Sequence, residues 1–155
     1  LGFDFSKYQN FSIISNTPYN ISSELINKIM RNSNYISSAL LMLQKEVAYK
    51  HNYKEKKANK YKFFTKLCSE YKICFKISRN VFYPKPKVNS CIVKFNFFKN
   101  NINWNHVDKF SNKIFSNRRK IISNKISLQN YNEKIFIKRI EELNIEDIIK
   151  IYKFL

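Results

Sequence analysis

The chain has 155 residues and carries 29 Lys and Arg against 11 Asp and Glu, which gives a net charge of +18. This length suits one hydrophobic core with at most a small satellite domain, and the 44% of hydrophobic residues argues against intrinsic disorder. The charge favours a polyanionic partner, most commonly a nucleic acid. No apolar run is long enough to span a bilayer, so we expect no membrane partner.

Two features of the composition exclude further kinds of site. The three cysteines show no CxxC spacing, and the two histidines, His51 and His106, lie far apart, so we expect neither a structural metal site nor a disulfide framework. The only glycine is Gly2. A phosphate-binding loop needs several glycines, because its backbone takes positive φ angles and approaches the phosphate closely. We therefore expect no nucleotide-binding loop of that kind in this chain.

Lysine outnumbers arginine 24 to 5, and Asn and Ile each occur 21 times. Lys, Asn and Ile all have codons rich in A and T, which indicates a bias of the genome. A single lysine is therefore weak evidence of function, whereas a scarce arginine carries more weight.

The first part of the chain predicts a βαβ unit. The apolar run Phe11–Ser15 is typical of a buried strand, and Asn-Thr-Pro ends it. A helix follows, with Asn20 as a plausible N-cap and an apolar residue at every fourth position. The continuous apolar run Ile36–Gln44 is typical of a strand covered on both faces.

The middle of the chain predicts two helices and two strands. Residues 45–62 read as a helix followed by an exposed basic loop, and helical spacing resumes over Tyr61–Glu70. Residues 71–77 and 90–97 alternate apolar with polar residues, as strands do, and flank a proline-rich loop. Residues 45–99 carry 15 Lys and Arg against 3 Glu, a net charge of +12. This region is the best candidate for electrostatic contact with RNA.

Beyond a polar linker at residues 100–105 the apolar period becomes helical. One stripe comprises Val107, Phe110, Ile114 and Ile121, while lysines fall on another face. Two further helical segments are expected around Ile135–Leu143 and Glu146–Leu155. The fold class predicted is thus α/β over residues 1–99, followed by a small all-α domain over residues 100–155.

The stretch Asn16-Thr17-Pro18-Tyr19 stands where open α/β sheets place their ligands, at the carboxyl end of a strand. The Asn16 side-chain oxygen can accept a hydrogen bond from a planar amine. Pro18 has no N–H, which can leave the Thr17 carbonyl free as a second acceptor. Tyr19 offers a flat face for stacking. Such a group can hold the exocyclic amine of a flipped-out base, although the same residues also suit a simple turn at the end of a strand.

Four blocks in order decide between these interpretations: "NTPYNISSEL", "MLQKEVA", "VFYPKPKVNSCIV" and "FSNRRKIISNKI". With them the chain resembles the ribosomal RNA adenine dimethyltransferase family, in its bacterial and organellar branch, over nearly its whole length. The resemblance implies the carboxyl-terminal half of a Rossmann-like class I methyltransferase domain and a helical RNA-binding domain. It also implies S-adenosyl-L-methionine as the methyl donor. The expected reaction is dimethylation of two adjacent adenosines in small-subunit ribosomal RNA.

The resemblance also assigns roles to residues of this chain. Asn16 and the backbone of Thr17 and Pro18 should hold the target amine, with Asn16 beside the methyl donor, and Tyr19 should stack on the adenine. Phe82 should close the other side of the base; the alternative is a core aromatic residue. Expected RNA contacts, which could instead be solvated or paired surface cations, are Lys85, Lys87, Arg118, Arg119 and Lys120.

The chain departs from the family pattern at three places. Thr17 replaces the usual Leu, Asn89 replaces an acid, and "ANKYKFFTKLCSEYK" lacks the expected Gly-Arg-Leu-Ser run. The glycine-rich donor loop and the acidic donor-binding residues are expected upstream, so we expect this chain alone to be inactive and the complete protein to be the enzyme.

Two other functions stay open. One is an inactive RNA-binding factor of ribosome assembly, and the other is a mitochondrial transcription factor derived from the same family. We expect the small ribosomal subunit as partner, a monomer, and a home in a bacterial cytoplasm or an organelle rather than the nucleolus.

Overall fold

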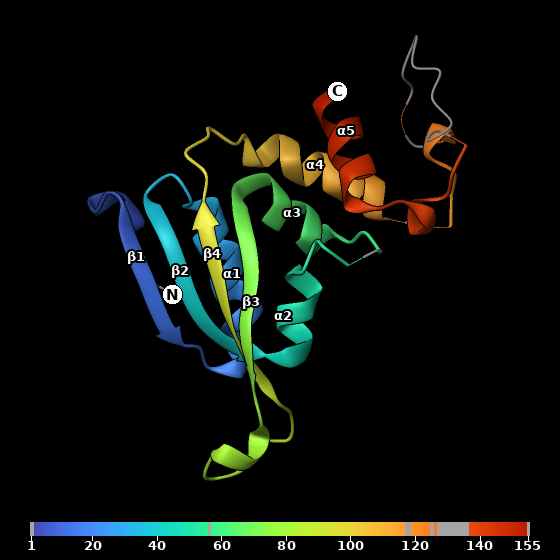
Figure 1. Ribbon diagram of the computed structural model, residues 1–155. Helices are drawn as coiled ribbons and strands as arrows, with labels where there is room; N and C mark the ends of the chain where they lie inside the picture. Colours follow the sequence, from blue (N-terminus) through green and yellow to red (C-terminus); the bar gives the residue numbers. More distant parts are fainter. Residues whose placement is uncertain (1, 56, 117–118, 125, 127–136, 155) are drawn as a thin grey trace.

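The computed structural model describes residues 2–55, 57–116, 119–124, 126 and 137–154 (Figure 1). Its centre is a four-stranded sheet, and the buried side chains of the strands face the helices. The order across the sheet is β1 (Phe11–Asn16), β2 (Ile36–Gln44), β4 (Ser90–Phe97) and β3 (Ser69–Ile77). Among the described residues, no helix is long and apolar enough to cross a bilayer.

The predicted βαβ unit is confirmed. β1 and β2 run parallel, and α1 (Ser22–Arg31) connects them. The apolar stripe of α1 is buried against the sheet, with Ile26 and Ile29 each 1% exposed. The prediction that the first strand is buried was wrong. β1 lies at an edge of the described sheet, and its side chains alternate between half-buried and exposed, with Ile14 82% exposed.

Asn20 is not the N-cap of α1. A 3-10 helix, Tyr19–Ile21, follows Pro18, and α1 begins only at Ser22. The Pro18 carbonyl accepts hydrogen bonds from the Ile21 N–H (3.2 Å) and the Ser22 hydroxyl (3.0 Å). These two bonds take the place of a side-chain cap, and the N-cap of α1 is Ile21.

The middle of the chain follows the prediction closely. After β2 come α2 (Lys45–His51) and α3 (Lys60–Cys68), and β3 and β4 form an antiparallel hairpin beside β2. β4 alternates as expected, with Val93 and Phe95 buried against the helices and Lys94 exposed on the other face. The loop of residues 78–89, which contains the 3-10 helix Arg79–Val81, projects beyond the end of the sheet in Figure 1.

Apart from turns, irregular segments and one isolated β-bridge, the described residues after 100 are helical, in α4 (Trp104–Phe115), α5 (Ile145–Phe154) and short 3-10 helices. Val107, Phe110 and Ile114 are buried as predicted, but α4 ends at Phe115, before Ile121. Ile121 instead pairs with Arg139 in an isolated β-bridge. Of the helix expected at residues 135–143, residues 135–136 lie outside the described part, and the described part forms only the 3-10 helix Ile140–Glu142. A further short 3-10 helix, Phe5–Lys7, precedes the sheet.

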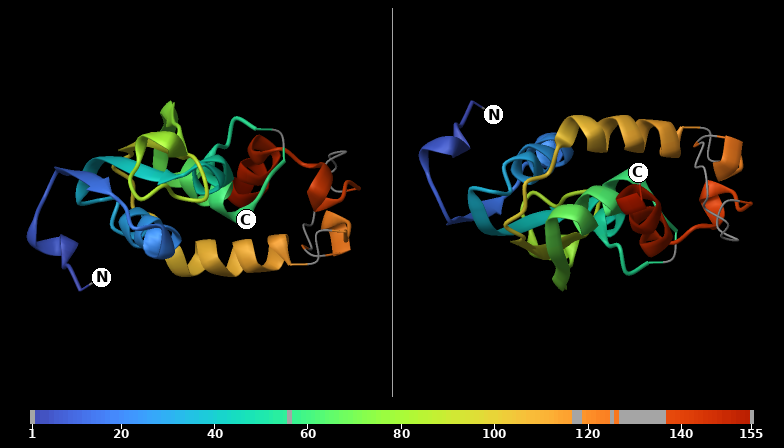
Figure 2. Two further views of the ribbon diagram at one scale, coloured as in Figure 1. Left: turned by 90° about the horizontal axis from the view of Figure 1, so that it is seen from below. Right: turned by 90° about the horizontal axis from the view of Figure 1, so that it is seen from above.

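The hydrophobic core continues from the sheet into the carboxyl-terminal helices. Phe63 of α3 lies 5.3 Å from Phe110 of α4 and 5.3 Å from Tyr152 of α5, between ring centroids. Arg31 of α1 forms an ion pair with Asp108 of α4, in which Nη2 donates to both carboxylate oxygens, at 2.8 and 2.9 Å. Figure 2 shows α4 and α5 on the side of the molecule away from β1. The secondary structure therefore changes near residue 100 while the core does not break.

Candidate active site

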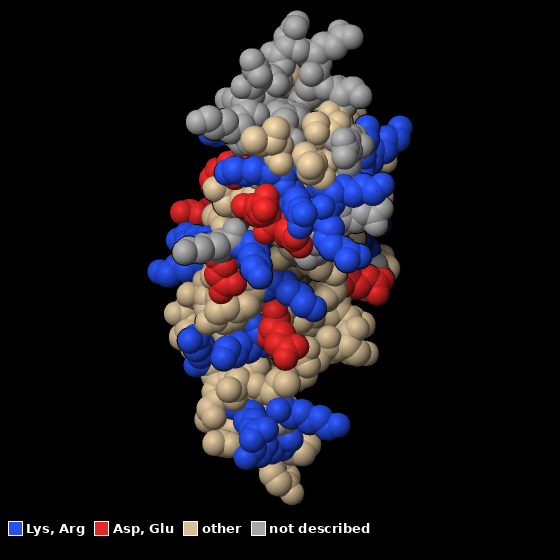
Figure 3. Space-filling view, turned by 90° about the vertical axis from the view of Figure 1, so that its right-hand side faces the viewer, with Lys and Arg blue, Asp and Glu red and all other residues tan. Residues whose placement is uncertain are grey.

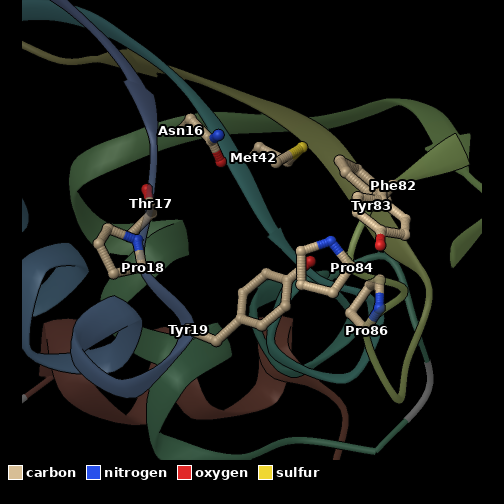
Figure 4. Close-up of a pocket in the computed structure, with 9 residues that line it drawn as sticks. All are labelled: Asn16, Thr17, Pro18, Tyr19, Met42, Phe82, Tyr83, Pro84 and Pro86. Atoms are coloured by element: carbon tan, nitrogen blue, oxygen red, sulfur yellow. The ribbon is translucent and has the colours of Figure 1, made fainter.

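A cavity of about 350 Å³ lies where β1 ends. It is lined by all five residues that were expected to hold the target base, namely Asn16, Thr17, Pro18, Tyr19 and Phe82 (Figure 4). Phe82 is far from the other four along the chain. The complete lining is Asn16, Thr17, Pro18, Tyr19, Met42, Phe82, Tyr83, Pro84 and Pro86.

The first wall of the cavity is the end of β1 and the residues after it. Asn16 is the last residue of β1 and pairs with Met42 of β2, toward which its exposed side chain points in Figure 4. Thr17 is buried, and its hydroxyl makes only a long contact of 3.4 Å with the Ser15 hydroxyl. No described residue donates a hydrogen bond to the Thr17 carbonyl. An amide oxygen and an unpaired peptide carbonyl thus stand next to each other in the sequence.

Tyr19 is fixed by a long-range contact. Its hydroxyl lies 2.7 Å from the hydroxyl of Ser90, the buried first residue of β4. This hydrogen bond orients the half-buried ring along the floor of the cavity. Sequence reasoning missed Ser90, since nothing local pairs it with a residue 71 positions away.

The second wall is the proline-rich loop. Phe82 is half-buried, whereas Tyr83 is fully exposed at 102%. In Figure 4 Pro84 lies between the ring of Tyr19 and those of Phe82 and Tyr83. The two rings expected to sandwich a base therefore make no direct contact and face the cavity from opposite sides.

Asn89 ties the loop together. Its side-chain oxygen accepts from the Arg79 N–H at 2.9 Å, and its carbonyl accepts from the Lys45 N–H at 2.9 Å. The Arg79 guanidinium donates from Nη1 to the Lys87 carbonyl at 3.1 Å. Asn89 was noted as a departure from the family pattern; its side-chain amide closes the base of the loop, and its main-chain carbonyl joins the loop to α2.

Comparisons with known proteins show which family the chain belongs to. The family described as ribosomal RNA adenine dimethylase matches residues 3–155. The chain belongs to this family. Ribosomal RNA small subunit methyltransferase A of Malacoplasma penetrans is 39% identical in an alignment of 144 residues that covers 90% of this chain and 51% of that protein. The protein of the same name from a Hydrogenobaculum strain is 34% identical in an alignment of 155 residues, gaps included, that covers 98% of this chain and 60% of that protein. The chain thus spans about half to three fifths of the length of these curated relatives.

Solved structures show the same fold. A dimethyladenosine transferase from Plasmodium falciparum matches with a TM-score of 0.72 at 22% identity, over 90% of this chain and 64% of that chain. The 23S rRNA methyltransferase ErmE matches with a TM-score of 0.72 at 17% identity, over 95% of this chain and 66% of that chain. At these identities the likeness establishes the fold. The predicted Rossmann-like α/β class is therefore confirmed.

The residues of this dimethylase family member that were expected to contact RNA lie in two places. Lys85 and Lys87 are exposed on the loop, and Figure 3 shows Lys and Arg gathered at this tip of the molecule. Arg119 and Lys120 are exposed after α4. In Figure 1 the segment that follows α4 lies at the opposite end of the molecule from the loop. Arg118 lies outside the described residues. The structure thus brings the loop lysines close to the cavity but does not bring the second group there.

Proposed function

We propose that the whole protein containing this chain is an S-adenosylmethionine-dependent dimethyltransferase. Its substrate would be the exocyclic amine of two adjacent adenosines in small-subunit ribosomal RNA. The observation that supports this proposal is the cavity in which Asn16 and the unpaired Thr17 carbonyl lie opposite Phe82. The names of the bacterial relatives, which specify the small ribosomal subunit, support the choice of RNA.

The cavity fits an adenine that has left the base stack. Its volume, about 350 Å³, lies within the range of small-ligand sites. Tyr19 and Phe82 offer two apolar faces, and an enzyme that modifies a base must first bring it out of the stack. Tyr83 and the two loop lysines are exposed beside the cavity, where an RNA strand could contact them.

The chemistry follows from the two acceptors. The adenine amine would donate one hydrogen bond to the Asn16 side-chain oxygen and one to the Thr17 carbonyl. These bonds hold the amine in place and draw electron density toward its nitrogen, whose lone pair is otherwise delocalised into the ring. They also favour the positive charge that develops on the nitrogen during methyl transfer. The proton that the amine loses is free to leave to solvent through the open rim.

S-adenosylmethionine supplies an electrophilic methyl group. Asn16 fits a position beside it, since it is exposed at the carboxyl end of a parallel strand, where open α/β sheets bind ligands. The described chain offers no glycine-rich turn for the remainder of the donor. We place that part of the site in the segment that the curated relatives have in addition.

The same proposal covers the finer expectations. Residues 1–99 would hold the base, and the helical segment 100–155 would contact RNA through Arg119 and Lys120. The whole protein would act as a monomer on the small ribosomal subunit, in a bacterial cytoplasm or an organelle with its own ribosomes.

Replacing Asn16 tests the function directly. In the whole protein, Asn16→Ala should lower the rate of adenine methylation of small subunits by about a hundredfold or more, the usual effect of removing one preorganised catalytic hydrogen-bond partner. RNA affinity should stay the same, because the charged surface is unchanged. The matched control is Asn20→Ala, an exposed asparagine of the adjoining 3-10 helix that does not line the cavity. Full methylation by Asn16→Ala would contradict the role of Asn16, whereas a wild-type protein that does not methylate adenosine would leave an RNA-binding assembly factor as the better function.

A further inference from the structure

A second hollow, of about 320 Å³, lies against the same loop. Its lining comprises Lys45, Glu46, Arg79, Lys87, Val88 and Asn89, none of which lines the base cavity. The loop of residues 78–89 is therefore a shared wall, with a base-sized cavity along one part of it and a cationic hollow along another. We propose that this hollow, which we name the phosphate hollow, binds a backbone phosphate next to the nucleotide held in the cavity, with Arg79 as its principal ligand.

Arg79 is already oriented for this task. Its main-chain N–H is held by the Asn89 side chain, and its Nη1 donates to the Lys87 carbonyl. An arginine side chain has five donors, so most of the guanidinium remains available after this one bond. A planar guanidinium binds two phosphate oxygens at once, which a lysine ammonium cannot do in the same way. Arginine is also scarce in this chain, at 5 residues against 24 lysines, so compositional bias does not account for it.

The charges around Arg79 are not neutralised by nearby acids. The lining contains three cations, Lys45, Arg79 and Lys87, and one acid, Glu46. None of these four residues forms an ion pair with a described residue. The ammonium of Lys45 also lies 5.9 Å from the centroid of the Tyr49 ring, and so does that of Lys76, which does not line the hollow. Cations from α2 and the loop therefore line the hollow together, which favours a phosphate of a polyanionic strand.

The base cavity makes RNA the preferred source of that ligand. A nucleotide inserted between Tyr19 and Phe82 carries a phosphate on each side of its sugar, and the strand must continue past the loop that forms the second wall. Phosphate contacts fix the register of a nucleic acid without reading its sequence. The phosphate hollow would thus determine which nucleotide of the strand reaches Asn16. This inference rests on the proposed function.

The test measures RNA affinity at several salt concentrations. The probe is a fluorescent RNA hairpin with two adjacent adenosines in its loop, bound by the whole protein. Each phosphate contact contributes about one to the slope of log affinity against log salt. Arg79→Ala should reduce that slope by about one and weaken binding by about tenfold. Arg79→Lys should have the wild-type slope but only part of the wild-type affinity, because a lysine keeps the charge and lacks the planar guanidinium that binds two phosphate oxygens.

Two further variants keep the test decisive. Lys45→Ala removes a cation of the hollow without touching the hydrogen bonds of the loop side chains, and it should lower the slope even if Arg79→Ala disturbs the loop. Lys150→Ala removes an exposed lysine of α5 as the matched control and should change neither quantity. Arg79→Ala and Lys45→Ala both behaving like Lys150→Ala would overturn the inference. If the wild-type protein does not methylate adenosine yet the slope falls in both variants, the proposed function fails and the phosphate hollow stands.

Discussion

The hydroxyl of Tyr19 lies 2.7 Å from the hydroxyl of Ser90, and this single bond joins the end of β1 to the start of β4. Ser90 pairs with Ile77, the last residue of β3, so the proline-rich loop begins and ends beside Ser90. The position of the Tyr19 ring is therefore set by the hairpin that carries Phe82. The geometry of the base cavity depends on two segments holding each other in place.

Ser90→Ala should reduce methylation by the whole protein while leaving RNA affinity unchanged, because the Tyr19 ring loses its anchor but no charge is lost. The free energy of unfolding should fall by about 1 kcal/mol, the usual net value of one hydrogen bond. Tyr19→Phe removes the same bond and should behave alike. Rates and urea unfolding of both single variants and of the double variant check this. A double variant as impaired as the sum of the two would show that the hydroxyls act independently.

Thr17 offers the opposite test, a change at the site that should do little. If its carbonyl is the second acceptor, the side chain is dispensable. Thr17→Val keeps the shape and removes only a hydroxyl whose contact with Ser15 is long, at 3.4 Å. We expect methylation at the wild-type rate and a change in the free energy of unfolding of about 1 kcal/mol or less. A loss of methylation comparable to that of Asn16→Ala would assign the role to the hydroxyl instead.

The order of elements around the site followed from local sequence patterns. The bounds predicted for β2 and β4 match those found, because apolar runs and strict alternation report which faces of a strand are buried. The grouping of Asn16 with Phe82 came from the resemblance to the family, because no local pattern relates residues so far apart along the chain, and both residues line the cavity.

What the sequence could not predict depends on long-range partners. The start of α1 was placed at Asn20 because no local rule says that the Pro18 carbonyl will accept two hydrogen bonds from the turn behind it. Ile121 continues the apolar period of α4, yet the helix ends at Phe115 and Ile121 pairs with Arg139. Ser90 and Arg79 were overlooked for the same reason, since their importance comes from residues distant along the chain or across a loop.

The continuous core predicts that the α/β part and the carboxyl-terminal helices unfold together. Phe63 contacts both Phe110 and Tyr152, and Trp104, the only tryptophan, lies on α4 within 5.6 Å of Phe64. Phe63→Ala should lower the free energy of unfolding by about 3–5 kcal/mol. Urea curves from Trp104 fluorescence and from far-UV circular dichroism should coincide in the wild type and shift together in the variant. Two separate transitions would instead mark an independent helical domain beginning near residue 100.

The free energy of unfolding should depend on pH below neutrality because of His51. This imidazole is buried between α2 and α3 with its Nδ1 2.9 Å from the Thr65 hydroxyl. Burial, together with a smaller effect of the Lys50 charge, lowers the pKa of His51 from 6.5 to about 3. The unfolded chain therefore takes up a proton near its ordinary pKa while the folded protein does not. The stability that depends on the neutral ring is present above pH 6.5 and is lost as the pH falls toward about 3.

His51→Gln keeps a hydrogen-bonding group beside Thr65 but does not titrate. Each unit of difference between the folded and unfolded pKa corresponds to about 1.4 kcal/mol. The free energy of unfolding of the wild type should therefore fall between about pH 6.5 and about pH 5, where carboxylates are still largely ionised. The curve of His51→Gln should be flatter over that interval. Urea unfolding at a series of pH values measures both, with the exposed His106→Gln as control. Parallel curves for His51→Gln and the wild type would mean that the ring takes up its proton in the folded protein as readily as in the unfolded chain.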